Sequence, residues 1–271
     1  MAPIGWRLTK VSQQVENLQE NLEADENLID GGKVMSLFDH LVELRQRIVK
    51  SLMAVLVFFC ISMVFSTELI EFLKQPLLSV IPDPQKALHF TGPLDVFLTS
   101  IKVGFLAAIV CACPVWIYQF WRFIEPALYK KERKLILPFV FLSVTLFVAG
   151  IAFCFYIILP LALEFLINLG KEVGNPIITI TDYTSMLTLL IFGFGFIFET
   201  PLFLVLLAIL GLVNADQLAK YRRFVVVGIL FAGAILTPPD PMSQIGMAIP
   251  LYLMYEASIL VIRFIKRENP A

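Results

Sequence analysis

Apolar runs long enough to cross a lipid bilayer dominate the chain. A transmembrane helix needs about 17 to 25 residues, and four runs reach that length, at residues 51–67, 103–121, 135–163 and 183–215, the last broken only by Glu199. Two more marginal runs follow, at 224–239 and at 241–262, the second interrupted by Glu256. The pattern predicts an all-α polytopic membrane protein with six transmembrane helices.

Prolines occur in or beside these runs and in the first outer connection. Each proline in a run removes a backbone hydrogen bond and favours a kink, so we expect kinked helices that form a concave bundle. The first outer connection, residues 68–100, is long and rich in turn residues, and its apolar side chains need burial. We therefore expect it to form short helices that make an outer cap. The prolines of the runs are Pro114, Pro138, Pro160, Pro201 and Pro250.

Lysine and arginine positions predict the orientation. With six spans and the amino end inside, nearly all of the 21 basic residues fall on the inner side, which is the cytoplasmic side by the positive-inside rule. Both termini are therefore expected in the cytoplasm. We divide the chain into an acidic cytoplasmic tail at 1–35, a six-span membrane domain at 36–265 and a second tail at 266–271. The basic residues left outside are Lys74, Lys86, Lys102 and Lys171.

A charge-dense amphipathic helix is predicted at residues 38–47, directly before the first run. Asp39, Glu43 and Arg47 follow one another at i,i+4 and support a helix. Glu43 can pair within its own helix or receive a positive charge from another molecule, and the spacing alone leaves both possible. Its apolar side consists of Leu37, Leu41, Leu44 and Ile48.

A second acid, Glu132, lies among four basic residues on the same predicted membrane face as Glu43. Exposed pairs with its neighbours contribute only about 0–1 kcal/mol. Two carboxylates at one interface can instead bind two adjacent guanidinium groups through bidentate, charge-assisted hydrogen bonds. Local pairing is the simpler of these two interpretations.

Several polar residues occur at membrane depth. A carboxylate such as Glu199 costs roughly 2.5–3.5 kcal/mol there, so it is expected to face the interior of the bundle or a wet cavity. The alternative is a protonated glutamate that serves packing only. Glu256 lies within reach of the inner surface, Gln244 can bind a partner helix or face headgroups, and Asp240 is interpreted as a turn former or helix cap.

Enzymatic chemistry is not indicated. The chain has no Walker loop, no HExxH and no GxSxG, and it contains only two histidines. Four cysteines in apolar runs suggest neither a disulfide framework nor a metal site. We predict no cofactor, no metal and no nucleic-acid partner. Mean hydropathy is +0.82, which places the chain among membrane proteins.

Several motifs together resemble the TatC subunit of the twin-arginine protein translocase. They are FDHLVELRQRI before the first run, YQFWRFIEPALYKKER after the second, FGFGFIFETP in the fourth, and TPPDPMSQ followed by AIPLYLMYE at the end. The resemblance extends over about residues 35–262 and leaves the amino tail outside. It implies the signal-peptide receptor of a machine that exports folded proteins and is driven by the proton-motive force.

The resemblance also implies roles for individual residues. Glu43 and Glu132 would receive the twin-arginine motif, with Arg45, Gln119 and Phe123 at or near the same site. Glu199 would line the concave face, Gln244 would help to dock single-span TatA- and TatB-type subunits, and Glu256 would be a further intramembrane contact. Pro76 and Asp240 fall on structural positions of the family. A multimeric receptor complex is expected.

The location and two other classes of function complete the predictions. A bacterial inner membrane is favoured, with the thylakoid membrane as the alternative. A proton-coupled secondary transporter would use Glu199 for coupling, although the repeat symmetry usual in such proteins is not found. A membrane scaffold without a receptor role would tolerate changes at Glu43 and Glu132. Binding to an immobilised twin-arginine signal peptide separates these functions.

Overall fold

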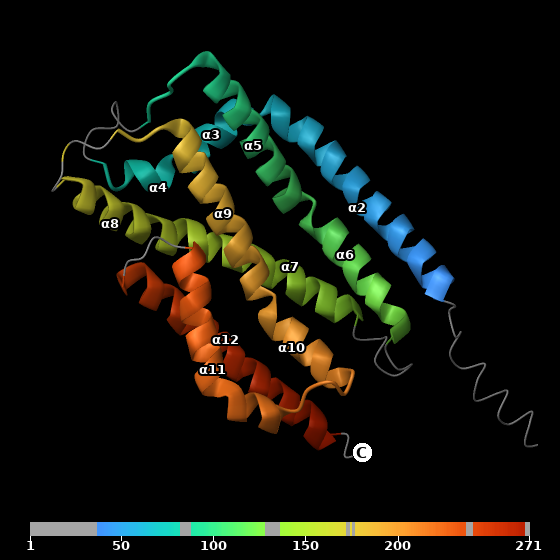
Figure 1. The fold of residues 1–271 in the computed structure, drawn as a ribbon. Helices are drawn as coiled ribbons and strands as arrows, with labels where there is room; N and C mark the ends of the chain where they lie inside the picture. Colours follow the sequence, from blue (N-terminus) through green and yellow to red (C-terminus); the bar gives the residue numbers. More distant parts are fainter. Residues whose placement is uncertain are drawn as a thin grey trace, which may run out of the picture. The chain divides into compact units, whose positions relative to one another are not determined.

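The computed structural model describes residues 37–81, 88–127, 136–171, 174, 177–236 and 241–268, which are helical almost throughout (Figure 1). Outside the helices these residues form turns, short irregular segments and one parallel bridge, between His89 and Thr179. The predicted all-α class is confirmed. The chain divides into two compact units, residues 1–46 and 47–271, with the boundary inside α2. The helices are α2 (Leu37–Val64), α3 (Ser66–Leu73), α4 (Gln75–Leu78), α5 (Pro93–Cys111), α6 (Cys113–Ile124), the 3-10 turn η2 (Glu125–Ala127), α7 (Ile136–Phe153), the π-helix η4 (Cys154–Ile158), α8 (Leu159–Lys171), α9 (Ile180–Phe198), α10 (Thr200–Ile209), α11 (Ala215–Leu236) and α12 (Pro241–Glu268).

Capping residues set the start of the two helices that follow the outer connections. Pro93 opens α5, and the Asp95 carboxylate accepts hydrogen bonds from the backbone N–H groups of Thr91 and Gly92 at 2.9 and 3.1 Å. Thr179 caps α9, because its hydroxyl oxygen accepts from the N–H of Asp182 at 3.1 Å. These bonds satisfy N–H groups that have no partner within the helix.

Three of the predicted kinks coincide with breaks in the helices. Pro114 follows the turn at Ala112 between α5 and α6, and Pro201 follows the turn between α9 and α10. Pro160 lies just after the π-helix η4, where the regular hydrogen-bond ladder is already disturbed. Pro250 lies inside α12, which continues through it without a break.

Five helical segments in the described part of the chain are long and apolar enough to cross a membrane. They match five of the six predicted runs. The remaining run, at 224–239, belongs to α11, which begins with a charged stretch. Its apolar part, residues 224–236, reaches only about 20 Å at 1.5 Å per residue, so a sixth span stays a prediction. The five segments are His40–Val64, Pro93–Cys111, Ile136–Gly170, Ile180–Ile209 and Gln244–Phe264.

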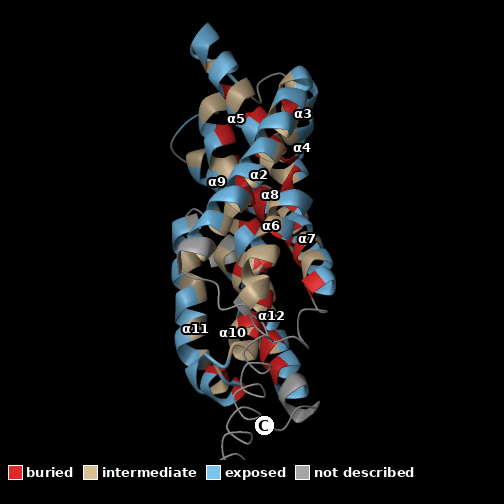
Figure 2. Cartoon of the chain, turned by 90° about the vertical axis from the view of Figure 1, so that its right-hand side faces the viewer, coloured by how far each residue is buried: buried red, intermediate tan, exposed pale blue. Residues whose placement is uncertain are grey.

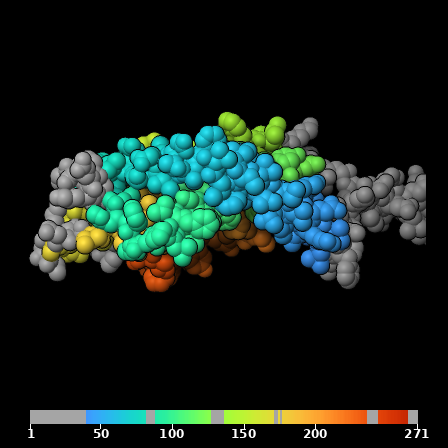
Figure 3. All heavy atoms as spheres, turned by 90° about the horizontal axis from the view of Figure 1, so that it is seen from above, coloured from blue at the N-terminus to red at the C-terminus, as the bar shows by residue number. Residues whose placement is uncertain are grey.

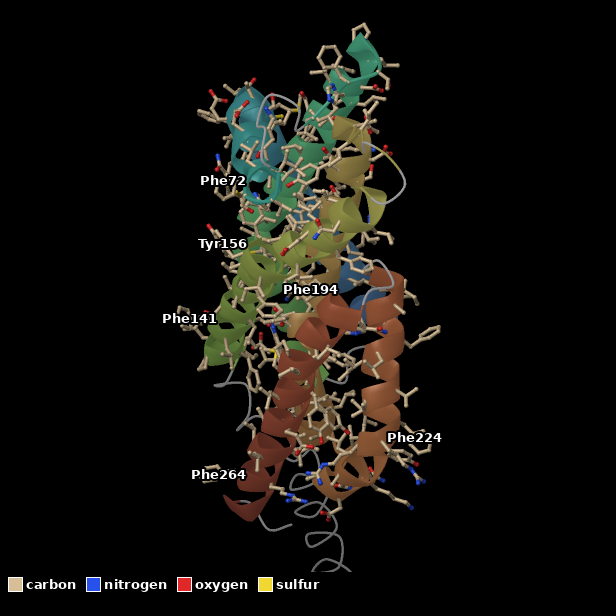
Figure 4. All side chains as sticks on the ribbon, turned by 90° about the vertical axis from the view of Figure 1, so that its left-hand side faces the viewer. Phe72, Phe141, Tyr156, Phe194, Phe224 and Phe264 are labelled. Carbon is tan, nitrogen blue, oxygen red and sulfur yellow. The ribbon has the colours of Figure 1, made fainter. Side chains whose placement is uncertain are left out.

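Close packing of α7 against α9 forms the centre of the second unit. A Cβ atom added to Gly150 would lie 2.7 Å from the backbone oxygen of Phe194, and one added to Gly195 would lie 2.6 Å from the Phe147 ring. Phe147 and Phe194 are fully buried. Figure 4 shows Phe194 in the interior, and Figure 2 shows the buried residues gathered on the inner sides of the helices. The glycines therefore allow two helices to approach closely.

The outer surface of the second unit is apolar. Phe141 is 75% exposed and Phe231 is 68% exposed, as expected for side chains that face lipid. Within this unit residues 47–64 of α2 lie beside α5 (Figure 3). The rings of Phe59 on α2 and Phe105 on α5 meet edge to face with centroids 6.4 Å apart.

The short helices expected in the first outer connection are present as α3 and α4. Pro76 is buried in α4, and its carbonyl oxygen accepts a hydrogen bond from the Ser79 hydroxyl at 2.7 Å. Leu77 beside it is completely buried in the main core. The predicted short helices are confirmed, but the burial expected of their apolar side chains holds in α4 only, since α3 has no buried residue and Phe72 is 52% exposed.

Candidate functional site

A largely apolar cavity of about 350 Å³ opens where α6, α7, α9 and α10 meet. Half of the described residues that line it are aromatic, and Glu199 is the only ionisable side chain among them. A space of this size and lining is typical of ligand and peptide sites. The residues that line it are Trp116, Ile117, Phe120, Trp121, Ser143, Phe196, Glu199, Thr200, Phe203 and Leu206.

The break between α9 and α10 places Glu199 in this wall. Glu199 ends α9 and precedes α10, whose second residue is Pro201. Because proline cannot donate a backbone hydrogen bond, the helix is interrupted here. The sequence FETP therefore puts a carboxyl group at a helix break.

A chain of two hydrogen bonds fixes the Glu199 carboxyl. The Trp121 indole Nε1–H donates to the Ser143 hydroxyl at 2.9 Å, and that hydroxyl donates to Glu199 Oε2 at 2.6 Å. Trp121 and Ser143 are both buried. Glu199 Oε1 is also buried and has no hydrogen-bond partner among the described residues. An unsatisfied buried oxygen costs about 1–3 kcal/mol.

A second polar group lies at the end of α6. Arg47 on α2 donates from Nη1 to Gln119 Oε1 at 3.2 Å. Phe123 is half-buried one turn further along α6, on the same helix face as Gln119. Arg122 forms an ion pair with Glu125 next to it. This end of α6 therefore presents an amide, an aromatic ring and a guanidinium group close together.

An ion pair joins α11 to α12. Arg222 donates from Nε and Nη2 to the two oxygens of Glu256 at 2.6 and 2.7 Å, and the Tyr252 hydroxyl donates to the same carboxylate at 2.9 Å. Nearer the start of α12, Gln244 Nε2 donates to the Leu230 carbonyl oxygen of α11 at 2.9 Å. The polar side chains of α12 thus bind α11 within the chain.

Comparison with known proteins identifies the family. Residues 39–250 match the model of the Sec-independent protein translocase protein (TatC). The chain belongs to the TatC family. It is 40% identical to the TatC protein of Halothiobacillus neapolitanus over 92% of this chain and 69% of that protein. It is 37% identical to the TatC protein of Escherichia coli K12 over 84% of this chain and 88% of that protein.

Solved structures agree with the TatC assignment. The crystal structure of the twin-arginine translocase receptor TatC in DDM covers 82% of this chain and 98% of its own, with a TM-score of 0.72 and 38% identity. A second crystal structure of the same receptor gives a TM-score of 0.71 and 37% identity. The family predicted from the motifs is confirmed, and with it the prediction of a translocase component rather than an enzyme.

The structure describes some of the predicted site residues of this TatC-family chain and not others. Glu43 and Arg45 belong to the first unit, where Glu43 is half-buried and Arg45 is exposed on α2. Glu132 and Asp240 lie outside the described residues. Gln119 and Phe123 are brought together on α6, and Glu199 lines the cavity. The twin-arginine site therefore stays a prediction.

Sequence reasoning missed three residues of these sites, Trp121, Ser143 and Arg222. Nothing in the sequence indicates that Ser143 meets Glu199, because the contact depends on how α7 crosses α9. Arg222 was detectable, since Arg222 and Glu256 are equally far along the chain from Pro239. Two antiparallel helices that follow each other in the chain place residues at equal distances from their connection side by side.

Replacing Glu256 with glutamine tests the ion pair between α11 and α12. We expect the melting temperature in detergent to fall by roughly 2–4 °C, because the variant keeps the shape but loses the bidentate charge pairing. The matched control is Asp216→Asn, which removes an exposed carboxylate 3.8 Å from Arg263 and should change little. Equal melting temperatures for wild type and Glu256→Gln would show that the pair contributes nothing to stability.

Proposed function

We propose that the chain is the signal-peptide receptor and core subunit of a translocase that exports folded proteins bearing twin-arginine signal peptides, driven by the proton-motive force. The observation that carries this proposal is the similarity over 82% of the chain to a crystal structure of the twin-arginine translocase receptor. The aromatic cavity with its single carboxyl group agrees with it, because an apolar segment that enters the membrane needs such a surface.

The proposed recognition site lies on the inner membrane face. Glu43 and Glu132 bind the two guanidinium groups of the signal peptide, and Arg45, Gln119 and Phe123 surround them. One contact supports this arrangement, since Gln119 already accepts a hydrogen bond from the guanidinium group of Arg47. A weak internal bond of this kind can be exchanged for an incoming arginine.

The partners inside the membrane are single-span TatA- and TatB-type subunits, which assemble with the chain into a multimeric complex in the lipid bilayer. Glu199, Gln244 and Glu256 are the proposed polar contacts. Gln244 and Glu256 are bonded to α11, so partner helices would bind the α11–α12 pair as a preformed unit. Pro76 and Asp240 have structural roles.

The proposed location is the inner membrane of a bacterium, with the thylakoid membrane as the alternative. Both termini lie in the cytoplasm, and α11 completes six spans. Residues 1–35 form a cytoplasmic tail, residues 36–265 the membrane domain and residues 266–271 the second tail.

Export in living cells tests the proposed function. The chain, produced with its own single-span partners in a bacterium that lacks a TatC-family protein, should restore export of a folded fluorescent reporter with a twin-arginine signal peptide. A reporter with two lysines in place of the arginines should stay inside, and a protonophore should stop export. If the membrane-inserted chain restores no export, the proposed function is wrong.

A further inference from the structure

Glu199 is fixed from one side only. Ser143 Oγ donates to Glu199 Oε2, and the Trp121 indole donates to Ser143. These two hydrogen bonds connect α6, α7 and the break after α9. The other described side chains that line the cavity are apolar except Thr200 and Trp116, whose indole N–H donates to the Ile109 carbonyl oxygen. No second donor among the described residues reaches the Glu199 carboxyl.

The two hydrogen bonds have a fixed direction. An indole N–H can only donate, so the Ser143 oxygen accepts from Trp121 and its own proton is directed to Glu199. Because Trp121 is 3% exposed and Ser143 is 1% exposed, water does not compete for either bond. The hydroxyl proton of Ser143 is thereby directed at Oε2, and Oε1 stays buried without a partner among the described residues.

We propose that Ser143, oriented by Trp121, is a positioning residue that sets the resting position of the Glu199 carboxyl in the cavity wall. The unpaired Oε1 gains a partner when an apolar helix packs over the cavity and directs one polar hydrogen-bond donor into it, so that the carboxyl turns to meet this donor. This inference rests on the proposed function, in which that helix belongs to a single-span subunit of the TatA and TatB type. The positioning itself does not depend on any substrate.

Infrared difference spectroscopy on the full-length protein, without signal peptide, tests the positioning. The carboxyl band of Glu199 is identified by its loss in Glu199→Gln. Ser143→Ala should shift this band, Trp121→Phe should shift it less in the same direction, and Ser143→Thr, which keeps the hydroxyl, should restore the wild-type position. An unshifted band in Ser143→Ala would overturn the proposal.

Two control variants separate positioning from general disturbance. Thr145→Val removes another hydroxyl of α7, one that donates to the Phe141 carbonyl oxygen at 2.8 Å. Trp116→Phe removes the other indole of the cavity, which donates to the Ile109 carbonyl oxygen at 3.1 Å. Both variants should leave the Glu199 band in place. If either control shifts the band as much as Ser143→Ala does, the proposal that Ser143 positions Glu199 is wrong.

Export provides the second readout. Ser143→Ala should reduce export of a twin-arginine reporter roughly threefold to tenfold, as expected for the loss of one hydrogen bond to a carboxyl group, and Ser143→Thr should rescue it. A shifted band with unchanged export would overturn the functional part of the inference. If the wild-type chain restores no export, the proposed function is wrong. The positioning of Glu199 is still tested in that case, because the infrared spectrum is measured without signal peptide.

Discussion

Replacing Gly150 with valine is expected to lower the melting temperature of the detergent-solubilised protein by roughly 10 °C, from overpacking of about 3 kcal/mol. A Cβ atom at Gly150 would already lie 2.7 Å from the Phe194 backbone oxygen and 2.8 Å from Phe198 Cβ. Backbone atoms cannot move aside as a flexible side chain can. The helices α7 and α9 would therefore have to separate.

The matched control for this prediction is Gly228→Val. Gly228 is also a helical glycine, but a Cβ atom there meets nothing within 4 Å. We expect its melting temperature to stay within about 2 °C of wild type, the range of surface substitutions. Similar losses in both variants would mean that valine itself, rather than the close contact of α7 with α9, destabilises the chain.

Removal of either carboxylate of the proposed recognition site should produce the second large effect. Glu43→Gln and Glu132→Gln should each weaken binding of a twin-arginine signal peptide roughly tenfold to hundredfold, because each loses a charge-assisted hydrogen bond to a guanidinium group. Glu43→Lys and Glu132→Lys should weaken it further by repulsion. Binding is measured by titrating labelled peptide into the purified protein.

Asp216→Asn is the control for the loss of an acidic charge. Its carboxylate lies on α11 at 94% exposure and belongs to none of the proposed sites. We expect peptide binding in this variant to match wild type. If Glu43→Gln and Glu132→Gln also bind like wild type, the chain recognises signal peptides elsewhere or is a scaffold.

The sequence predicted the helices well because membrane spans follow from apolar length alone. It predicted kinks at Pro114 and Pro201 from the missing N–H of proline, and the helices break beside both residues. Pro250 differs from these two, since α12 continues through it without a break. In membranes neighbouring helices can satisfy the freed carbonyl group, and the neighbours of a proline are not visible in the sequence.

For the candidate sites too, the sequence predicted some residues and not their contacts. Glu199 was identified from its depth, because an ionisable group inside the membrane needs a reason to be there. Its partner Ser143 was not identified, since the contact spans 56 residues and depends on the crossing of two helices. The pairing of Arg222 with Glu256 follows from hairpin geometry, and sequence reasoning did not apply it.

The ratio of two affinities tests the receptor function most directly. The purified full-length protein in lipid nanodiscs is titrated with a twin-arginine signal peptide and with the same peptide carrying two lysines. Arginine binds carboxylates through a planar bidentate fork and lysine does not. We predict that the arginine peptide binds at least about tenfold more tightly. Equal affinities would contradict the proposal that this chain is a twin-arginine receptor.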